Sequence, residues 1–263
     1  MPTIKAFCEY LHNLAPLDLA EEWDNVGLLV GDTSRVLRRV MTCLTITPYS
    51  AAEAVAKQAD MIVAHHPLPF RPLKTITNET PVGRMLLQLI HNQVAIYSAH
   101  TAFDAARDGI NQQLANGLAL ADVQPLFNPS ENDSSVGTGR TGKLPTTARL
   151  DQVSENLKEF LGLPYVRVVG PADLSIQQVA IACGSAGQFL PQARAAQCEL
   201  LVTGETSFHT CLEAEATSIG LLLVGHFASE RFAMETLAQQ IAADHAGLDV
   251  WASQREADPL RLV

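Results

Sequence analysis

The sequence predicts an α/β fold built from a duplicated motif, and three observations support this. Apolar runs typical of buried strands alternate with helical stretches, which is the pattern of an α/β layer with parallel or mixed strands. The alternation occurs twice, and the distance from Val40 to Met61 equals the distance from Val179 to Leu200. With 263 residues and 47% hydrophobic content, the chain also has enough apolar material for a packed core.

The first round follows an amphipathic N-terminal helix, which places Ile4, Phe7, Leu11 and Leu14 on one side. Because polar residues interrupt this stretch, it resembles an ordinary first helix and not a signal peptide. The strand-like runs of this round cover 40–46, 61–66 and 94–99, and helices are expected near 49–59 and 81–92.

The second round has strand-like runs at 178–187, 200–205 and 220–226, with helices expected near 189–197, 210–217 and 228–243. Between the rounds, residues 128–145 are rich in Gly, Ser, Thr and Asn, so we expect a long loop or a crossing between two lobes. The next stretch, 150–164, is helical by its apolar spacing, with Asp151 as a candidate N-cap and Gly162 near the C-terminal end.

Composition excludes several classes of function. The net charge of −10 opposes binding to long nucleic acid, whose affinity comes largely from Lys and Arg, unless bound cations reverse the local field. Every apolar run is too short to span a bilayer. Five cysteines, an odd number without CxxC spacing, argue against a disulfide framework and for a reducing compartment, so we expect a cytoplasmic protein.

Two near-copies of one motif indicate the chemistry: His100 with Asp104, and His226 with Glu230. In each copy a strand-like run is followed by a His and a carboxylate four residues apart, which lie on one face of a helical turn. Such a pair has a structural alternative, because an acid near a helix N-terminus also stabilises the first turn.

A third strand-like run ends in His65-His66. Either ring could instead be buried and hydrogen-bonded in a turn, but Pro67 favours an irregular stop at which both rings can serve one site. Strand ends of an α/β fold converge on the sheet edge where ligands bind. Taken together, the His and carboxylate groups predict a site for two divalent metal ions, of the kind found in hydrolases.

Three further residues are candidates for substrate contacts. For the Gly-rich stretch 136–142 a turn is the default interpretation, and the alternative is that Arg140 is exposed there toward an anionic substrate. Glu205 and His209 could reach the site as acid–base or substrate contacts, or could simply cap and hydrogen-bond locally. The glycines of 183–187 follow a strand and could cradle an anion, although a tight turn is the default interpretation.

Motifs in order along nearly the whole chain resemble the Nif-three-like family of dinuclear-metal proteins, also labelled type 2 homologues of GTP cyclohydrolase I. They are "EEWDNVGLLVG", "MIVAHHPLPF", "IYSAHTAFDAARDGIN", "VGTGRTG", "LLVTGE" and "GHFASE". The resemblance implies two intertwined α/β lobes, here a metal-binding lobe of residues 1–125 plus 225–263 and a second lobe of 126–224. It also implies a toroidal homohexamer, a trimer of dimers, with metal sites facing an inner cavity.

The resemblance further implies the roles of individual residues. The metal ligands would be His65, His66, Asp104, His226 and Glu230, with Glu230 bridging the two ions. His100 would orient a ligand carboxylate or a metal-bound water, so Glu230 and His100 are the candidate catalytic residues. Asp24 and Asn25 match a motif that we expect to hold the loop beside the site.

Five protein groups cannot fill the coordination of two divalent ions, so a metal-bound hydroxide is the expected nucleophile. We therefore expect a hydrolase acting on a nucleotide-like or other anionic small molecule. The ligand types leave iron, zinc, manganese and nickel open. Two other functions also stay open: a non-catalytic metal-binding or metal-storage assembly, and a ring that contacts proteins or single-stranded nucleic acid.

Overall fold

The computed structural model describes residues 1–127 and 133–261, which form two compact units. Unit 1 comprises Met1–Phe103 and the chain from Ala233 onward, and unit 2 comprises Asp104–Phe232. The chain passes from one unit to the other within α4 (His100–Ala105) and within α9 (His226–Asp244). These boundaries differ from the expected ones at 125/126 and 224/225, so Asp104, His226 and Glu230 all fall in unit 2.

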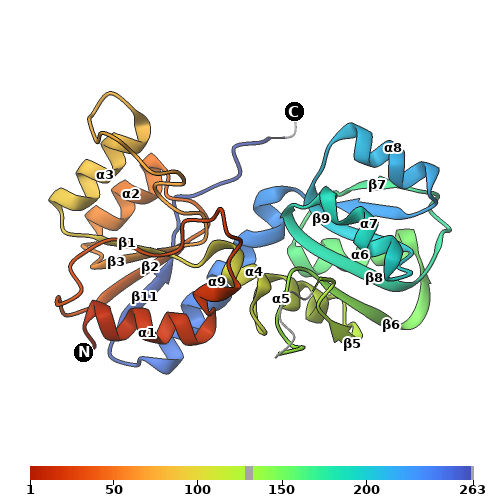
Figure 1. Cartoon of the computed structure of the whole chain (residues 1–263), viewed down its shortest axis with the longest axis horizontal. Coiled ribbons are helices and arrows are strands. Elements are labelled where there is room, and N and C mark those ends of the chain that lie inside the picture. Colours follow the sequence, from red (N-terminus) through yellow and green to blue (C-terminus); the bar gives the residue numbers. More distant parts are fainter. Residues whose placement is uncertain (128–132, 262–263) are drawn as a thin grey trace. The chain divides into compact units, whose positions relative to one another are not determined.

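The sheet of unit 1 has the strand order β1-β4-β3-β2-β11 (Figure 1). The central strands β2, β3 and β4 are parallel, β11 joins β2 in parallel, and β1 pairs antiparallel with β4. The strand bounds are β1 (Gly27–Val30), β2 (Arg39–Cys43), β3 (Met61–Ala64), β4 (Ala95–Ser98) and β11 (Asp249–Ala252).

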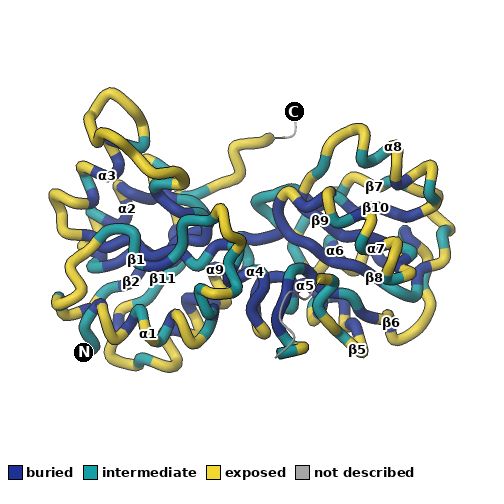
Figure 2. Tube along the Cα trace, in the orientation of Figure 1, coloured by how far each residue is buried: buried dark blue, intermediate teal, exposed yellow. Residues whose placement is uncertain are grey.

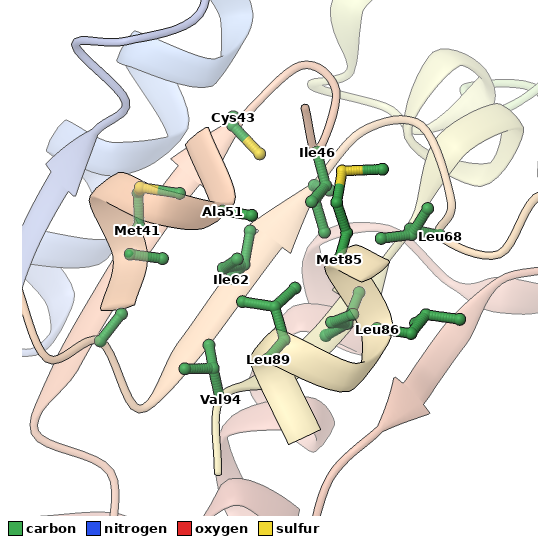
Figure 3. Close-up of a cluster of buried hydrophobic side chains, with 14 residues drawn as sticks. Met41, Cys43, Ile46, Ala51, Ile62, Leu68, Met85, Leu86, Leu89 and Val94 are labelled. Atoms are coloured by element: carbon green, nitrogen blue, oxygen red, sulfur yellow. The ribbon is translucent and has the colours of Figure 1, made fainter. Parts of the chain in front are cut away.

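Helices cover both faces of this sheet. On one face α2 (Pro48–Ala56) and α3 (Pro81–His91) pack against alternate strand residues, among them Met41 and Ile62 (Figure 3). The other face is covered by α1 (Ile4–Leu14) and α9, and the Thr42 hydroxyl donates to the Met234 carbonyl there. The predicted helices at 49–59 and 81–92 are thus present, and each begins with a proline after a threonine N-cap.

The sheet of unit 2 has the order β5-β6-β8-β9-β10-β7, with β8, β9 and β10 parallel. The other three strands pair antiparallel, β7 with β10 and β6 with both β5 and β8. The strand bounds are β5 (Ala121–Gln124), β6 (Arg140–Arg149), β7 (Arg167–Val169), β8 (Ser175–Ser185), β9 (Leu200–Glu205) and β10 (Gly220–Leu223).

In unit 2, α7 (Leu190–Ala195) and α8 (Phe208–Ala216) pack on one face of the sheet, against Ala180, Leu201 and Leu221. The remaining helices are α5 (Ile110–Gly117) and α6 (Leu150–Leu161). The central strand β9 of this unit is buried almost throughout and is drawn dark (Figure 2), and in unit 1 the strands β3 and β4 are buried in the same way. Such continuous burial is expected of parallel strands covered on both faces.

The equal spacing predicted from the sequence is confirmed by the register of the sheets. Val40 pairs with Met61 in unit 1, and Val179 pairs with Leu200 in unit 2, each across a parallel strand pair. The mixed α/β architecture, with two sheets and nine α-helices within the described residues, agrees with the predicted fold class.

Two local predictions are wrong. The expected loop over 128–145 gives way at Arg140 to β6, whose alternately buried residues include Gly142, where a Cβ would crowd the Ala121 carbonyl of β5. A loop prediction failed here because two of the three alternately buried residues, Arg140 and Gly142, give no apolar signal, and Leu144 alone does not make a period. Residues 128–132 of that expected loop lie outside the described residues. The N-cap of α6 is Arg149, and Asp151 lies inside the helix, where it pairs with the Arg149 guanidinium.

The unit boundary at Phe103/Asp104 has a physical reason. The segment that follows α4 is bonded to the rest of unit 2. Its strand β5 pairs with β6, and the Asn111 side chain of α5 accepts from the Cys183 amide of β8. Among the described residues, we find no helix with the length and apolar character needed to cross a bilayer.

Candidate metal centre

In unit 1, three imidazoles gather where two neighbouring parallel strands end. His65 and His66 follow β3, and His100 begins α4 just after β4. Each of the three rings offers one ligand atom, and these atoms lie within 4.8 Å of one another. The ring centroids are 5.0 Å apart for His65 and His66, and 5.2 Å and 5.4 Å from these two to His100.

The backbone at the strand ends fixes this cluster. The backbone amides of His65 and His66 donate to the carbonyls of Cys43 and Leu44. The hydrogen bonding between β3 and β2 therefore continues past the end of β3 to both histidines. The Ser98 hydroxyl donates to the His65 carbonyl over 2.6 Å. His100 has a φ of 30°, a left-handed conformation that costs on the order of 1–3 kcal/mol for a residue other than glycine and is typical of functional sites.

Two of these rings are oriented through Nδ1. Nδ1 of His66 is hydrogen-bonded to Thr45 Oγ1 at 2.6 Å, and Nδ1 of His100 donates to Asp24 Oδ1 at 2.7 Å. Burial raises the pKa of Asp24, but the bonds from His100 and Thr101 outweigh it and lower the pKa to about 2. Asp24 is therefore a carboxylate, and its partner nitrogen on His100 must carry a proton.

The loop around Asp24 is tied down as the sequence led us to expect. The Asn25 side chain donates to the Pro69 carbonyl over 2.7 Å, and the Asn25 amide donates to Asp24 Oδ1. Thr45 is also held in place, because the Glu256 carboxylate accepts from the amides of Leu44 and Thr45. A residue close to the end of the chain thus supports a contact to His66.

In unit 2, an imidazole and carboxylates meet at the start of α9. Nε2 of His226 lies 3.2 Å from Glu230 Oε2, and its Nδ1 donates to Glu205 Oε1 over 2.9 Å. The hydrogen bond to Glu230, opposed by burial and assisted by Glu205, raises the pKa of His226 to about 9. Glu230 itself is 3% exposed, and carboxylates this deeply buried are rare unless they are paired.

Two glycines make room for this group. Gly184, at a φ of +67°, lies so close to Glu230 that a Cβ there would collide with Oε1 of the carboxylate. Gly204, at the end of β9, would place a Cβ 2.7 Å from Ser229 Oγ of α9. The glycines near the ends of β8 and β9 therefore let the first turn of α9 approach these strands.

Cys183 completes the group, although no motif in the sequence had singled it out. Its thiol donates to Asp104 Oδ1 over 3.2 Å. Burial, together with the charges of Asp104 and Glu230, raises the pKa of Cys183 well above its usual value, so the thiol stays protonated. Asn111 links the same residues, since it donates to the Asp104 carbonyl and accepts from the Cys183 amide. The strand-to-glycine sequence at 183–187 was the signal that could have revealed this.

The three candidate substrate residues fall in different places. The alternative that Arg140 is exposed toward a substrate is wrong: Arg140 is 1% exposed, and its guanidinium donates to backbone carbonyls such as those of Gly137 and Ala106. Burial lowers its pKa to about 10. Glu205 contacts His226, as described above. His209 is exposed in α8 with its ring 6.0 Å from that of Phe208, and a contact of His209 with substrate stays a prediction.

Known proteins resemble this chain along its whole length. A "Protein NIF3 homolog" of Schizosaccharomyces pombe is 37% identical over 257 residues, covering 92% of this chain and 91% of its own. A "GTP cyclohydrolase 1 type 2 homolog" of Clostridium acetobutylicum is 30% identical over 262 residues, covering 98% of both chains. A crystal structure of a Staphylococcus aureus hypothetical protein superposes with a TM-score of 0.90 at 25% identity, covering 100% of both chains.

A family profile described as Duf34/NIF3 (NGG1p interacting factor 3) matches residues 2–259. This agrees with the resemblance that the motifs suggested, and it spans both units. The chain belongs to the Duf34/NIF3 family.

Proposed function

We propose that this protein binds two divalent metal ions through His65, His66, Asp104, His226 and Glu230, and uses them to hydrolyse a nucleotide-like or other anionic small molecule. The imidazole nitrogens of unit 1 and the carboxylates and imidazole of unit 2 are a donor set that suits zinc, iron, manganese or nickel. The name of a relative, "GTP cyclohydrolase 1 type 2 homolog", is consistent with such a substrate.

One observation carries the proposal: three histidines are held through Nδ1 by an oxygen of the protein. The pairs are His66 with Thr45, His100 with Asp24, and His226 with Glu205. Metal-binding histidines are oriented in this way, because the partner on one ring nitrogen fixes the tautomer and directs the other nitrogen at the ion.

Each protein group has a part in the proposed chemistry. Bound ions would supply Lewis acidity and lower the pKa of coordinated water. Glu205 favours one orientation of His226, and Gly184 leaves space for the Glu230 carboxylate beside it. Cys183 donates to Asp104 and so fixes the direction in which this carboxylate presents its second oxygen. With its Nδ1 bonded to Asp24, His100 would present Nε2 to a ligand or a water molecule.

Assembly and location complete the proposal. We propose a homohexamer, a trimer of dimers, which light scattering of the purified protein would test. Five cysteines, an odd number without CxxC spacing, favour a reducing compartment, so we propose a cytoplasmic protein.

The experiment begins with elemental analysis of the protein purified without chelator. Phosphatase, amidase and GTP hydrolysis assays then follow with each metal restored. We expect about two ions per chain and turnover of one substrate class. His66→Ala and Glu230→Gln should abolish both metal retention and turnover.

The matched controls are His91→Ala and Glu235→Gln, which change exposed residues of the same types and should behave like the parent protein. Turnover that survives removal of the metals by a chelator would contradict the proposed metal-dependent hydrolase. Unchanged turnover in Glu230→Gln would contradict it as well. Two retained ions without turnover of any substrate would instead favour a metal-binding or storage protein.

A further inference from the structure

Two large aromatic side chains of unit 1 lie exposed beside the imidazole cluster. Trp23 is 60% exposed and Phe70 is 47% exposed. Their ring centroids are 6.0 Å apart, with the planes inclined at 42°. Both rings also lie against His100, at centroid distances of 5.8 Å for Trp23 and 5.9 Å for Phe70. Much of the area of each ring is therefore open to solvent at the edge of the proposed metal site.

These rings are held in place, although they belong to loops. Trp23 precedes Asp24, whose carboxylate accepts from His100 and from the amide and hydroxyl of Thr101. Phe70 follows Pro69, whose carbonyl accepts from the Asn25 side chain over 2.7 Å. The two loops are thus bonded to each other and to the start of α4. Rings fixed in this way lose little conformational freedom when a ligand binds, which favours affinity.

Trp23 and Phe70 contribute no ring to the buried core of unit 1, which consists of residues such as Phe7, Ile62 and Tyr97. An exposed pair of aromatic faces next to polar groups is the arrangement that proteins use to stack flat ring systems. The neighbouring polar group is His100, whose ring centroid lies 5.8 Å from that of Trp23.

We propose that Trp23 and Phe70 form a stacking platform for the planar heteroaromatic ring of the substrate. This inference rests on the proposed function, since it adds a ring to the anionic molecule that the metal site would bind. A ring seated on this platform lies beside His100 and so next to the imidazole cluster. Stacking is tolerant of ring type, so the platform selects for a flat ring and not for one base.

The test compares probes that share an anionic group and differ in the ring. Guanosine monophosphate and nicotinamide mononucleotide carry a ring, and ribose phosphate does not. Calorimetric titration of the full-length, metal-loaded protein should show that a ring-bearing probe binds at least about tenfold more tightly than ribose phosphate. Trp23→Ala and Phe70→Ala should each remove most of this difference, and Trp23→Phe should preserve most of it.

Phe208→Ala serves as the matched control, because Phe208 is 71% exposed in unit 2 and should not affect ring preference. Elemental analysis of Trp23→Ala and Phe70→Ala should give the parent metal content, and thermal melting verifies that each variant folds. Equal binding of all three probes to the parent, or a ring preference that survives both substitutions, overturns the proposal. A smaller oligomer in Trp23→Ala also overturns it, because the aromatic pair would then be a contact between copies of the chain.

The same titrations on chelator-treated protein separate this inference from the proposed function. Stacking needs no metal, so the ring preference should persist there even if absolute affinity falls. A protein that takes up no metal would refute the metal-dependent hydrolase, and the ring preference would still decide whether the platform exists.

Discussion

The two units share one arrangement of strands and differ in the chemistry that they place at the strand ends. In each unit three parallel strands that follow one another in sequence, β2 to β4 and β8 to β10, are flanked by an antiparallel strand that precedes them, β1 beside β4 and β7 beside β10. Unit 1 ends its middle strand in a His doublet, whereas unit 2 ends the corresponding strand in Gly204 and Glu205. One scaffold therefore supplies imidazoles directly from a strand, and its copy does not.

The difference teaches how a duplicated scaffold diverges. In unit 2 the space after the strands is taken up by the first turn of α9, which brings His226 and Glu230 to the strand ends. Side chains at Gly184 and Gly204 would collide with that turn, so glycine is required there and the candidate ligands come from the helix. In unit 1 the position that corresponds to Gly204 carries His65. The oxygens that orient the rings of His66 and His100 belong to Thr45 and Asp24, which lie in loops.

The largest expected effect tests the role of Gly184 in unit 2. Gly184→Ala would place a methyl group against the Glu230 carboxylate and displace it, so we expect metal affinity to fall by a factor of about 100 or more. The control is Gly162→Ala, because Gly162 has a similar φ of +65° and nothing within 4 Å of its added Cβ. Both variants should lose about 1–2 kcal/mol of stability from the left-handed backbone alone.

Metal content by elemental analysis and stability by denaturant unfolding separate the two contributions. If Gly184→Ala retained as much metal as Gly162→Ala, the space beside Glu230 would have no part in metal binding.

The second prediction concerns Glu53, which holds the C-terminal segment of unit 1. Its buried carboxylate accepts from Trp251, from the Ser253 hydroxyl, and from the amides of Gln254 and Arg255. Glu53→Gln replaces one acceptor oxygen by a donor, so we expect a loss of about 2–3 kcal/mol of unfolding free energy. Both tryptophans of the chain lie in unit 1, so their fluorescence during urea unfolding reports on this unit.

Glu53 also gives a pH dependence with a defined sign. Burial raises its pKa, but the bonds from Lys57 and Ser253 outweigh this, and the folded pKa lies below the ordinary 4.5. The stabilisation is therefore complete above pH 4.5 and is lost as the pH falls through the folded pKa. Glu53→Gln should lack this part of the acid sensitivity.

The control for the stability prediction is Glu155→Gln, which changes an exposed carboxylate and should alter the unfolding free energy by less than about 1 kcal/mol. An equal loss in both variants would refute the prediction.

The smallest expected effect concerns Thr45, which orients His66 in unit 1. Thr45→Val removes the hydroxyl and keeps the shape, so we expect about tenfold weaker metal binding with little change in stability. Competition with a coloured chelator would measure the affinity. Thr45→Ser restores the hydroxyl and should recover most of the loss, whereas a Ser variant as weak as the Val variant would point to packing and not to orientation of the ring.

The regular part of the fold could be predicted because its signals are local. The apolar periods of 49–59 and 81–92 and the equal spacing of the two rounds depend only on residues close in sequence, and the observed helices and strand register confirm them. The strand β6 was missed because its buried face carries Arg140 and Gly142 beside Leu144, and neither of the first two gives a hydrophobic signal even though the backbone pairs in the sheet.

The sequence allowed us to predict which residue types form the candidate site, but not which groups hydrogen-bond to them. His and carboxylate motifs at strand ends indicate metal chemistry from the sequence alone, because the ligand types and their spacing lie within short stretches. The oxygens that orient the rings are distant in sequence, as Asp24 is from His100, and no local pattern connects them. Arg140 failed in the opposite way, since a charged residue in a Gly-rich stretch looks exposed until its carbonyl partners are known.

By itself, the sequence determined the alternation of strands and helices, the duplication and the chemical character of the site, because hydrophobic periodicity and ligand type belong to short stretches of chain. The tertiary structure decided which oxygen holds each imidazole, why Gly184 must lack a side chain, and that Trp23 lies beside Phe70. The physical reason is that hydrogen bonds and steric contacts act over a few ångströms in space, between residues whose separation along the chain is set only by folding.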